Sequence, residues 1–442
     1  MFTKEIGNND NQFIIVNTLT SFVGILYNEE RNILLKWANE ENITPKTEKE
    51  TLLYDSLSDN QFLVKDDEEE KLIVDKIMAV CRNTHANRAG NSQKLVIALT
   101  YMCNFSCPYC FEQYHCNEKS GIITKEQVDR IFEIHKGSIS SIELFGGEPL
   151  LPTTKDIISY IFQEAPNETY CVTTNGYFLN EFLSLFKSVN VARIMVTLDG
   201  FRETHNKTRV LVNGEGTYDR IINNIESALA DNLHIRIRMN FTGANREECI
   251  SLREEFKKKY KKYYEKKLLS FDFHAVMQEN ESEKTDLYLN SLYSVTKGKE
   301  YSIADNVAIL SSYPLLKSLI LPKYKFNPQY CYCDSEERLY IYDPYGYIYS
   351  CPVALGNKDA SIGTYYPTYN LKSDSMLNRN IENVPECKEC INKFICGGGC
   401  ANQIIHPGES VLKPNCSDMN TQIDHLIAFA KRELDKHAEL AK

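Results

Sequence analysis

The chain has 442 residues, of which 43% are hydrophobic and 25% are charged, so it is long enough for a sizeable core and more than one globular domain. A formal net charge of −10 disfavours a nucleic-acid partner, because phosphates favour a basic surface. The first residues lack the apolar core of a signal peptide and no apolar run approaches the roughly 20 residues of a membrane span, so we expect a cytoplasmic protein without a membrane partner.

Residues 1–83 are predicted to form a small α+β domain with the order β-β-α-α-β. The expected strands and helices lie, in that order, at 12–20, 22–28, 29–42, 46–60 and 61–67. Residues 83–93 are polar and are predicted to be a linker.

From residue 94 the sequence alternates between apolar runs typical of strands and amphipathic runs typical of helices. Six strands are expected at 94–102, 139–147, 169–176, 192–200, 234–243 and 268–277. Helices are expected between them at 124–137, 153–165, 180–188, 217–232 and 245–267. Nearly all-apolar strands are typical of buried parallel sheets, and repeats of this length predict an α/β fold with a partial, TIM-like (β/α)6 barrel, which we place at 94–300.

Residues 325–420 are rich in Cys, Gly, Pro and Tyr and contain few periodic segments. Only residues 337–351 look regular, and they predict a hairpin that turns at Asp343–Gly346. A region with so little apolar core usually needs cross-links or metals to fold. A polar helix is expected to follow and to end the chain at residue 442.

The 15 cysteines are clustered along the chain, and their odd number and the expected reducing compartment indicate metal binding rather than a disulfide framework. Cys103, Cys107 and Cys110 form a C-x3-C-x2-C loop at the end of the first barrel strand. A [4Fe–4S] cluster has four irons that each need an outside ligand, so three thiolates leave one iron open to a cofactor or substrate. Zinc is the alternative, but no second C-x2-C pair follows until Cys387 and Cys390.

This spacing, with the aromatic Tyr109 just before Cys110, resembles the signature of the radical S-adenosylmethionine (SAM) enzymes. In that family SAM binds the open iron through its amino and carboxylate groups. An electron from the cluster then cleaves SAM to methionine and a 5′-deoxyadenosyl radical, which abstracts hydrogen from unactivated carbon.

Further motifs follow the next strands. Gly146 and Gly147 allow a close approach of the backbone to a ligand, and with Glu148 they match the family motif that binds the SAM amino group; by itself this segment would be a tight turn. By the same resemblance, Thr197 would lie near the SAM ribose and carboxylate, and Arg209 would pair with that carboxylate. A structural cap and a surface ion pair are the alternatives for these two residues.

The last third of the chain resembles the SPASM extension found behind some radical SAM barrels. Its pattern, C-x(9–15)-G-x4-C, C-x2-C-x5-C-x3-C and a final C, is matched in order by Cys333, Gly346, Cys351, Cys387, Cys390, Cys396, Cys400 and Cys416. The resemblance implies two auxiliary [4Fe–4S] clusters, hence three clusters in all. One would be bound by Cys387, Cys390, Cys396 and Cys416, and the other by Cys333, Cys351 and Cys400. Cys331 would supply a fourth ligand to the second set or replace Cys333. The remaining cysteines are interpreted as small hydrophobic residues: Cys81, Cys116, Cys171 and Cys249.

The N-terminal order resembles the winged-helix peptide-recognition domain that is fused to many peptide maturases and binds a leader peptide as an added strand. Because the SPASM branch mostly modifies peptides or proteins, the resemblance implies a maturase that installs a thioether, C–C or C–O cross-link in a ribosomally made precursor peptide. A flavodoxin- or ferredoxin-type protein would donate the electron. No residue can be assigned as the catalytic acid or base.

Three alternatives stay open. An anaerobic sulfatase maturase would carry an Asp directly after the Cys of the G-x4-C motif, but Pro352 occupies this position. A peptide epimerase uses the same cofactors. A non-catalytic, metal-stapled binding protein would explain the C-terminal cysteines but not a three-ligand site beside Glu148.

Overall fold

The computed structural model describes residues 3–9, 12–20, 22–40, 42–91, 93–112, 120–276, 327–333 and 339–416. The predicted C-terminal helix, Cys116 and the last part of the 94–300 segment lie outside these residues. Among the helices described, none combines the length and the apolar content needed to cross a bilayer.

The N-terminal part folds around a three-stranded antiparallel sheet in the order β1-β2-β3. Its elements are β1 (Thr3–Asn9), β2 (Gln12–Asn17), β3 (Val23–Tyr27), α1 (Asn28–Trp37) and α2 (Glu48–Asp59). The strands predicted within 12–20 and 22–28 and the two helices are confirmed, whereas the polar strand β1 was missed. The strand predicted at 61–67 is wrong, because Gln61 has a φ of +58° and turns the chain so that Phe62 enters the core beside Trp37.

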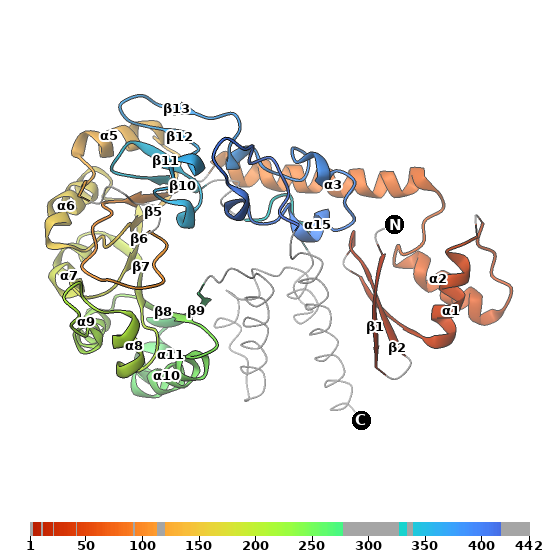
Figure 1. Ribbon diagram of the computed structural model, residues 1–442, viewed down its shortest axis with the longest axis horizontal. Coiled ribbons are helices and arrows are strands. Elements are labelled where there is room, and N and C mark those ends of the chain that lie inside the picture. Colours follow the sequence, from red (N-terminus) through yellow and green to blue (C-terminus); the bar gives the residue numbers. More distant parts are fainter. Residues whose placement is uncertain are drawn as a thin grey trace.

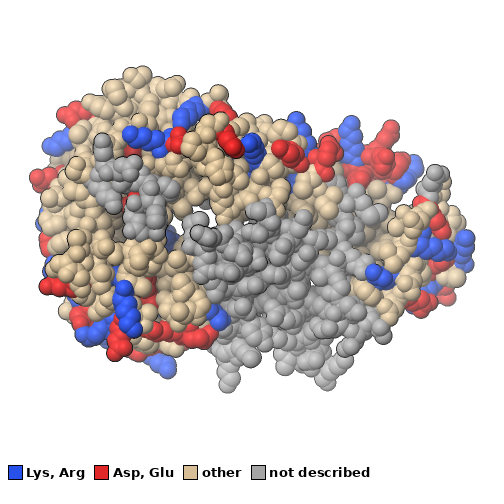
Figure 2. Space-filling model, in the orientation of Figure 1, with Lys and Arg blue, Asp and Glu red and all other residues tan. Residues whose placement is uncertain are grey.

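Helix α3 (Asp67–Asn91) includes most of residues 83–93. The prediction that these residues form a linker is therefore wrong. Met78 and Cys81 of α3 are buried against Ile381 and Val384 of the Cys-rich region, and this contact gives a polar segment a surface on which to stay helical. Figure 1 shows α3 running from the N-terminal sheet along the Cys-rich region. Its first turn is entirely acidic, which complements the positive end of the helix dipole, and acidic side chains gather over this helix in Figure 2.

The middle of the chain forms six parallel strands in sequential order, which confirms the six predicted strands and their α/β arrangement (Figure 1). The strands are β4 (Gln93–Ala98), β5 (Ile139–Phe145), β6 (Thr169–Thr174), β7 (Asn190–Thr197), β8 (Ile235–Phe241) and β9 (Leu269–Ala275). The helices are α5 (Lys125–Ile134), α6 (Lys155–Glu164), α7 (Leu183–Phe186), α8 (Arg202–Thr208), α9 (Tyr218–Ala230), α10 (Arg246–Lys259) and α11 (Lys261–Glu265). The helix predicted at 245–267 is thus split after Lys259, and α8 was not predicted. Consecutive residues of β4 are buried, so both of its faces are covered, as its apolar run predicts.

The Cys-rich region continues the barrel sheet instead of standing apart from it. Strands β10 (Leu339–Tyr342), β11 (Tyr347–Tyr349), β12 (Gly363–Thr364) and β13 (Asn370–Leu371) extend it to ten strands. The predicted hairpin is β10–β11, and β10 runs parallel to β4. The carboxyl end of β10 therefore lies at the same edge of the sheet as the carboxyl end of β4.

The other helical segments of the described residues are short. They are α15 (Lys393–Cys396) and the 3-10 turns η1 (Pro152–Thr154), η2 (Leu179–Glu181), η4 (Pro352–Ala354), η5 (Lys358–Ala360), η6 (Met376–Asn378), η7 (Pro385–Cys387) and η8 (Ala401–Ile404).

Candidate functional site

Three half-buried thiols lie on the loop that leaves the carboxyl end of β4. The loop is fixed locally, because the Phe105 N–H donates to Cys103 Sγ over 3.4 Å and the Cys110 N–H donates to the Cys107 carbonyl over 3.2 Å. It also docks on the chain after α8, since the Ser106 N–H donates to the Val210 carbonyl over 2.9 Å. This loop therefore brings the cysteine motif next to Arg209.

A buried polar group stands beside the thiols. The Tyr109 hydroxyl donates to the Asp199 carboxylate and accepts from Arg209 Nη1 over 2.9 Å and from Asn240 Nδ2 over 3.4 Å. Arg209 is only 8% exposed and its guanidinium lies 5.6 Å from the Phe105 ring, which contradicts the alternative of a surface ion pair. Burial raises the pKa of Asp199, although the charge of Arg209 opposes this effect.

Sequence reasoning placed Tyr109 and Arg209 near one cofactor, and the fold brings them together. It missed Asp199 and Asn240. The available signal was a polar side chain at, or just after, the carboxyl end of a parallel strand, where sites collect in parallel barrels.

Two donors at this position have no hydrogen-bond partner among the described residues. They are Arg209 Nε and Asn104 Nδ2, and both atoms are buried. Leaving a buried donor unpaired costs about 1–3 kcal/mol, so such donors indicate a missing acceptor. A cationic donor beside three thiols fits an anionic group such as the carboxylate of SAM.

Glu148 is 1% exposed and its carboxylate is held from three sides. Its Oε1 accepts from the Leu150 N–H over 2.8 Å and from the Thr174 hydroxyl over 2.6 Å, and its Oε2 accepts from the Asn175 N–H over 2.6 Å. Burial raises the pKa of Glu148, and these hydrogen bonds oppose the rise. Asn175 also donates to Asn104 over 2.8 Å, so Glu148 is connected to the start of the cysteine loop.

The two glycines before Glu148 pack against the chain itself. A Cβ on Gly147 would lie 2.4 Å from the Met102 carbonyl oxygen, and one on Gly146 would lie 2.3 Å from the Thr100 carbonyl oxygen. The close approach that we predicted for a ligand is therefore made by the segment that leads into the cysteine loop. Thr197 is the last residue of β7, is 7% exposed and lies at the same edge of the sheet.

The four thiols that we predict to bind one auxiliary cluster interact electrostatically. Cys387, Cys390, Cys396 and Cys416 lie within electrostatic reach of one another. Burial raises the pKa of Cys387 to about 11 and that of Cys396 to about 12, and the neighbouring thiols add to both rises. These thiols would release protons on binding a metal, because only thiolates are good ligands.

The triple glycine between Cys396 and Cys400 explains how distant segments meet. Gly397, Gly398 and Gly399 all have positive φ, from 63° to 94°. A Cβ on Gly397 would lie 2.6 Å from the Cys331 carbonyl oxygen, and one on Gly399 would lie 2.2 Å from the Asn415 carbonyl oxygen. The loop therefore crosses the segments of Cys331 and Cys416 at backbone contact, a role that sequence reasoning did not assign.

The second predicted set is less compact. Cys331 is buried and its Sγ lies 3.9 Å from His85 Nδ1 of α3, Cys333 is exposed, and Cys351 and Cys400 are half-buried. Of the cysteines interpreted as hydrophobic, Cys81 and Cys249 are buried and Cys171 is half-buried. Within the described ranges no three His, Cys, Asp or Glu side chains are placed to hold one metal ion together.

Residues 97–256 match the model of the Radical SAM superfamily. A probable GTP 3′,8-cyclase from Saccharolobus islandicus is 31% identical over 171 residues, which cover 37% of this chain and 52% of the relative. GTP 3′,8-cyclase from Clostridium perfringens is 30% identical over 165 residues, which cover 36% of this chain and 50% of the relative. The chain thus spans about half the length of these curated relatives.

Two solved structures share the fold over more of the chain. The structure of anSMEcpe with bound AdoMet and the Cp18Cys peptide has a TM-score of 0.53 and 18% identity, covering 79% of this chain and 100% of that chain. Streptococcus suis SuiB bound to S-adenosylmethionine has a TM-score of 0.52 and 14% identity, covering 94% of this chain and 99% of that chain. These likenesses show the α/β radical SAM fold with its large parallel sheet.

Proposed function

We propose that this chain, which carries a radical SAM domain at residues 97–256, reductively cleaves SAM and uses the 5′-deoxyadenosyl radical to cross-link a ribosomally made precursor peptide. The bond formed would be a thioether, C–C or C–O link. The observation that carries the proposal is the meeting of three thiols, a buried Arg209 and a buried Glu148 at the carboxyl edge of the parallel sheet.

Different residues at this edge of the sheet would bind the iron–sulfur cluster and SAM. Cys103, Cys107 and Cys110 would hold a [4Fe–4S] cluster with one open iron, which supplies the electron that cleaves SAM. Arg209 would offer its unpaired Nε to the SAM carboxylate, and Glu148 would accept the SAM amino group. Tyr109 would hold the Arg209 guanidinium in place through their 2.9 Å hydrogen bond.

The C-terminal cysteines would hold two auxiliary [4Fe–4S] clusters in a SPASM domain over residues 325–420. The grouping of Cys387, Cys390, Cys396 and Cys416 supports the first of these. Cys333, Cys351 and Cys400 would hold the second, and the burial of Cys331 beside His85 supports Cys331 as its fourth ligand.

A peptide substrate is supported by the fold and by one relative. Among the described residues, β1 and β3 are the edge strands of the antiparallel sheet of the N-terminal domain, residues 1–83, and a leader peptide could add to such an edge as a strand. The related anSMEcpe was solved with AdoMet and a peptide. A flavodoxin- or ferredoxin-type protein would supply electrons to the barrel at residues 94–300.

The sulfatase-maturase alternative lacks its base. Pro352 stands where that family carries an Asp, and Asp343, which is nearby in sequence, is 1% exposed. Its carboxylate accepts from the Tyr101 hydroxyl over 2.9 Å and from the Tyr347 N–H over 2.8 Å. These bonds stabilise the turn between β10 and β11 and the segment that follows β4. This arrangement favours a cross-linking maturase.

The test uses full-length protein reconstituted anaerobically with iron and sulfide. Reduced by dithionite with SAM, wild-type protein should form 5′-deoxyadenosine, and Cys107→Ala should not. Cys249→Ala, which removes a buried thiol of helix α10 that is not part of the cysteine motif, is the control and should retain the activity. Formation of 5′-deoxyadenosine by Cys107→Ala would contradict the assignment.

The peptide assignment needs its own measurement. Incubation with the product of a short reading frame beside the gene should remove about two hydrogens per cross-link. Uptake of deuterium without mass loss would indicate an epimerase instead. Zinc in place of iron, with no SAM cleavage, would favour the metal-stapled binding protein.

A further inference from the structure

Arg379 is a fully buried cation in the Cys-rich region. It follows η6, is 1% exposed and is among the largest completely buried side chains. Burying a guanidinium costs several kcal/mol unless its donors are paired, so its partners indicate why it is there. They are carbonyl oxygens of two separate loops.

The first loop is the triple glycine. Arg379 Nη1 donates to the Gly399 carbonyl over 2.7 Å, and Nη2 donates to the Gly398 carbonyl over 2.5 Å. A Cβ on Gly398 would lie 3.4 Å from Nη1, so the guanidinium lies directly against this glycine. Arg379 thereby fixes the turn between Cys396 and Cys400.

The second loop precedes Cys416. Arg379 Nε donates to the Val411 and Lys413 carbonyls, each over 3.2 Å, and Nη2 donates to the Lys413 carbonyl over 2.9 Å. The planar guanidinium therefore clamps the segments of Cys396 and Cys416 to each other. A lysine ammonium could carry the charge but could not make this fork of hydrogen bonds.

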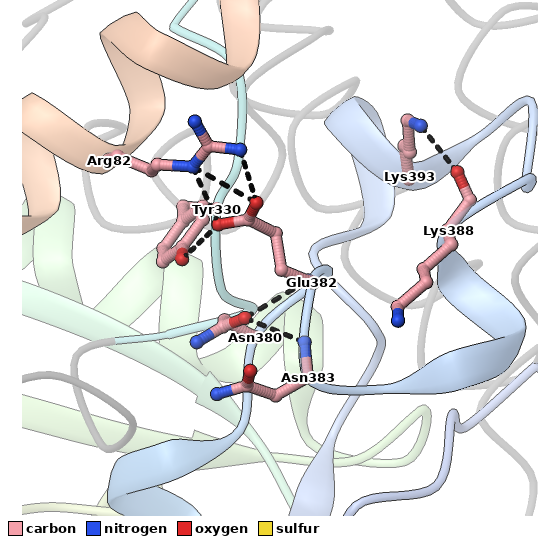
Figure 3. Close-up of polar contacts among 7 residues, drawn as sticks. All are labelled: Arg82, Tyr330, Asn380, Glu382, Asn383, Lys388 and Lys393. Atoms are coloured by element: carbon pink, nitrogen blue, oxygen red, sulfur yellow. Dashed lines mark hydrogen bonds and ion pairs between the residues drawn. The ribbon is translucent and has the colours of Figure 1, made fainter. Parts of the chain in front are cut away.

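The segment after Arg379 is itself held from two sides, as Figure 3 shows. The Asn380 side chain accepts from the Glu382 N–H and the Asn383 N–H, each over 3.0 Å, which closes the turn. Glu382 is bound by Arg82 of α3 and by the Tyr330 hydroxyl. These contacts hold the backbone next to Arg379 in place, so the guanidinium charge has a defined position.

That charge faces thiols. Arg379 lies within electrostatic reach of Cys387 and Cys416, which belong to the group of four described above. An iron–sulfur cluster held by four thiolates is an anion that gains another negative charge on reduction. A fixed cation in a region of low dielectric stabilises the reduced form more than the oxidised form, and local charge is a known determinant of cluster potential.

We propose that Arg379 is a positioning residue that closes the site of Cys387, Cys390, Cys396 and Cys416 and raises the reduction potential of the cluster bound there. This inference rests on the auxiliary cluster of the proposed function but not on its substrate. It assigns separate roles to the two features of Arg379: the hydrogen-bond fork shapes the site, and the charge sets the potential.

The test compares Arg379→Gln, Arg379→Lys and the control Arg253→Gln, which removes a buried arginine from α10. Each full-length protein is reconstituted, its iron is counted and its clusters are titrated with reductant while the EPR signal is followed. At a fixed potential near the midpoint, Arg379→Gln should show a ratio of reduced to oxidised cluster about tenfold lower for one signal, equivalent to about 59 mV for one electron. Arg379→Lys should keep most of the wild-type potential while binding less iron, and Arg253→Gln should behave as wild type.

The outcomes separate the two roles. If Arg379→Gln loses the iron of one cluster, a near-wild-type potential of the fraction of that cluster that Arg379→Lys still binds supports the role of the charge, and a lowered potential there overturns it. An unchanged potential in Arg379→Gln, or equal shifts in both Arg379 variants, would overturn it. Cleavage of SAM under dithionite depends on the Cys103–Cys110 loop and should persist in all variants. Wild-type protein that holds only about four irons would overturn this inference while leaving SAM cleavage intact.

Discussion

At the scale of single residues, Glu143 within β5 and Glu148 just after the end of β5 differ in the groups that surround their carboxylates. Both are buried and both accept from a threonine hydroxyl of the next strand, Thr174 and Thr173 respectively. Glu143 is neutralised by Lys94 at 3.2 Å and by Arg193 at 3.7 Å. Glu148 is instead held by the Leu150 and Asn175 N–H groups at the edge that carries the cysteine loop, and under the proposed function its carboxylate would accept the SAM ammonium.

Glu148→Gln should therefore weaken SAM binding by about 10- to 100-fold, because one charge-assisted hydrogen bond to an ammonium contributes about 1.5–3 kcal/mol. The iron content should be unchanged, since Glu148 is not among the proposed ligands of the iron–sulfur clusters. Equilibrium binding of SAM to the reconstituted protein measures the effect. Glu143→Gln is the matched control and should keep wild-type affinity; equal weakening by both substitutions would show that the strand, and not the ligand contact, was disturbed.

At the scale of elements, strand β10 connects the Cys-rich region to the barrel. It pairs with β4. Directly after β10, the Asp343 carboxylate accepts a hydrogen bond from the hydroxyl of Tyr101, which lies next to the cysteine loop. Asp343 also accepts the N–H groups of Tyr345 and Tyr347, so it closes the turn to β11. Burial raises the pKa of Asp343 to about 6, which makes this connection sensitive to pH.

The direction in which stability changes with pH follows from proton binding by Asp343. The ordinary pKa of Asp is about 4, so the folded state binds this proton more tightly than the unfolded state does. The contribution of Asp343 to stability is therefore full below about pH 4 and is lost as the pH rises through about 6, by at most about 3 kcal/mol.

Asp343→Asn should remove this dependence, because the amide carries no charge at any pH in this range. The midpoint of thermal unfolding of the iron-free protein should exceed that of wild type at pH 7, and the difference should shrink at pH 4.5. Asp359→Asn, at an exposed position, should show neither effect. A destabilisation by Asp343→Asn that is the same at both pH values would contradict the electrostatic account.

At the scale of the whole molecule, α3 joins the N-terminal domain to the Cys-rich region through one apolar cluster and several polar contacts. The apolar cluster contains Met78, Cys81, Ile381, Val384 and Phe394. The polar contacts include the bidentate pair of Arg82 and Glu382 and the hydrogen bond from the Thr18 hydroxyl to the Ile391 carbonyl over 2.6 Å. A cavity of about 600 Å³ opens beside them, between α3 and residues 381–393.

The apolar cluster should dominate this interface. Arg82 is 55% exposed and Glu382 is 30% exposed, and exposed pairs contribute about 0.2–1 kcal/mol, whereas Met→Ala in a core costs about 2–5 kcal/mol. Met78→Ala should therefore increase hydrogen exchange along α3 far more than Arg82→Gln does, and only the effect of Arg82→Gln should vanish at high salt. A larger effect of Arg82→Gln would assign the interface to the ion pair.

The sequence by itself determined the features that depend on local pattern. Apolar runs and helical spacing predicted the six parallel strands and most of the helices between them, because each run reports its own burial. Cysteine spacing predicts a cluster site at Cys387, Cys390, Cys396 and Cys416, and these four thiols interact electrostatically.

Only the tertiary structure decided the features that depend on contact between distant segments. The polar residues 83–91 continue helix α3, whose earlier turns Met78 and Cys81 anchor on the Cys-rich region, β10 pairs with β4 more than 200 residues away, and Arg379 joins two loops. The hydroxyl of Tyr109 meets Asp199 and Arg209 because parallel strands deliver their carboxyl ends to one edge. Local propensity is too weak to specify contacts between distant segments. These contacts depend on which apolar surfaces still have to be buried, and which hydrogen-bonding groups still need partners, once the sheet has formed.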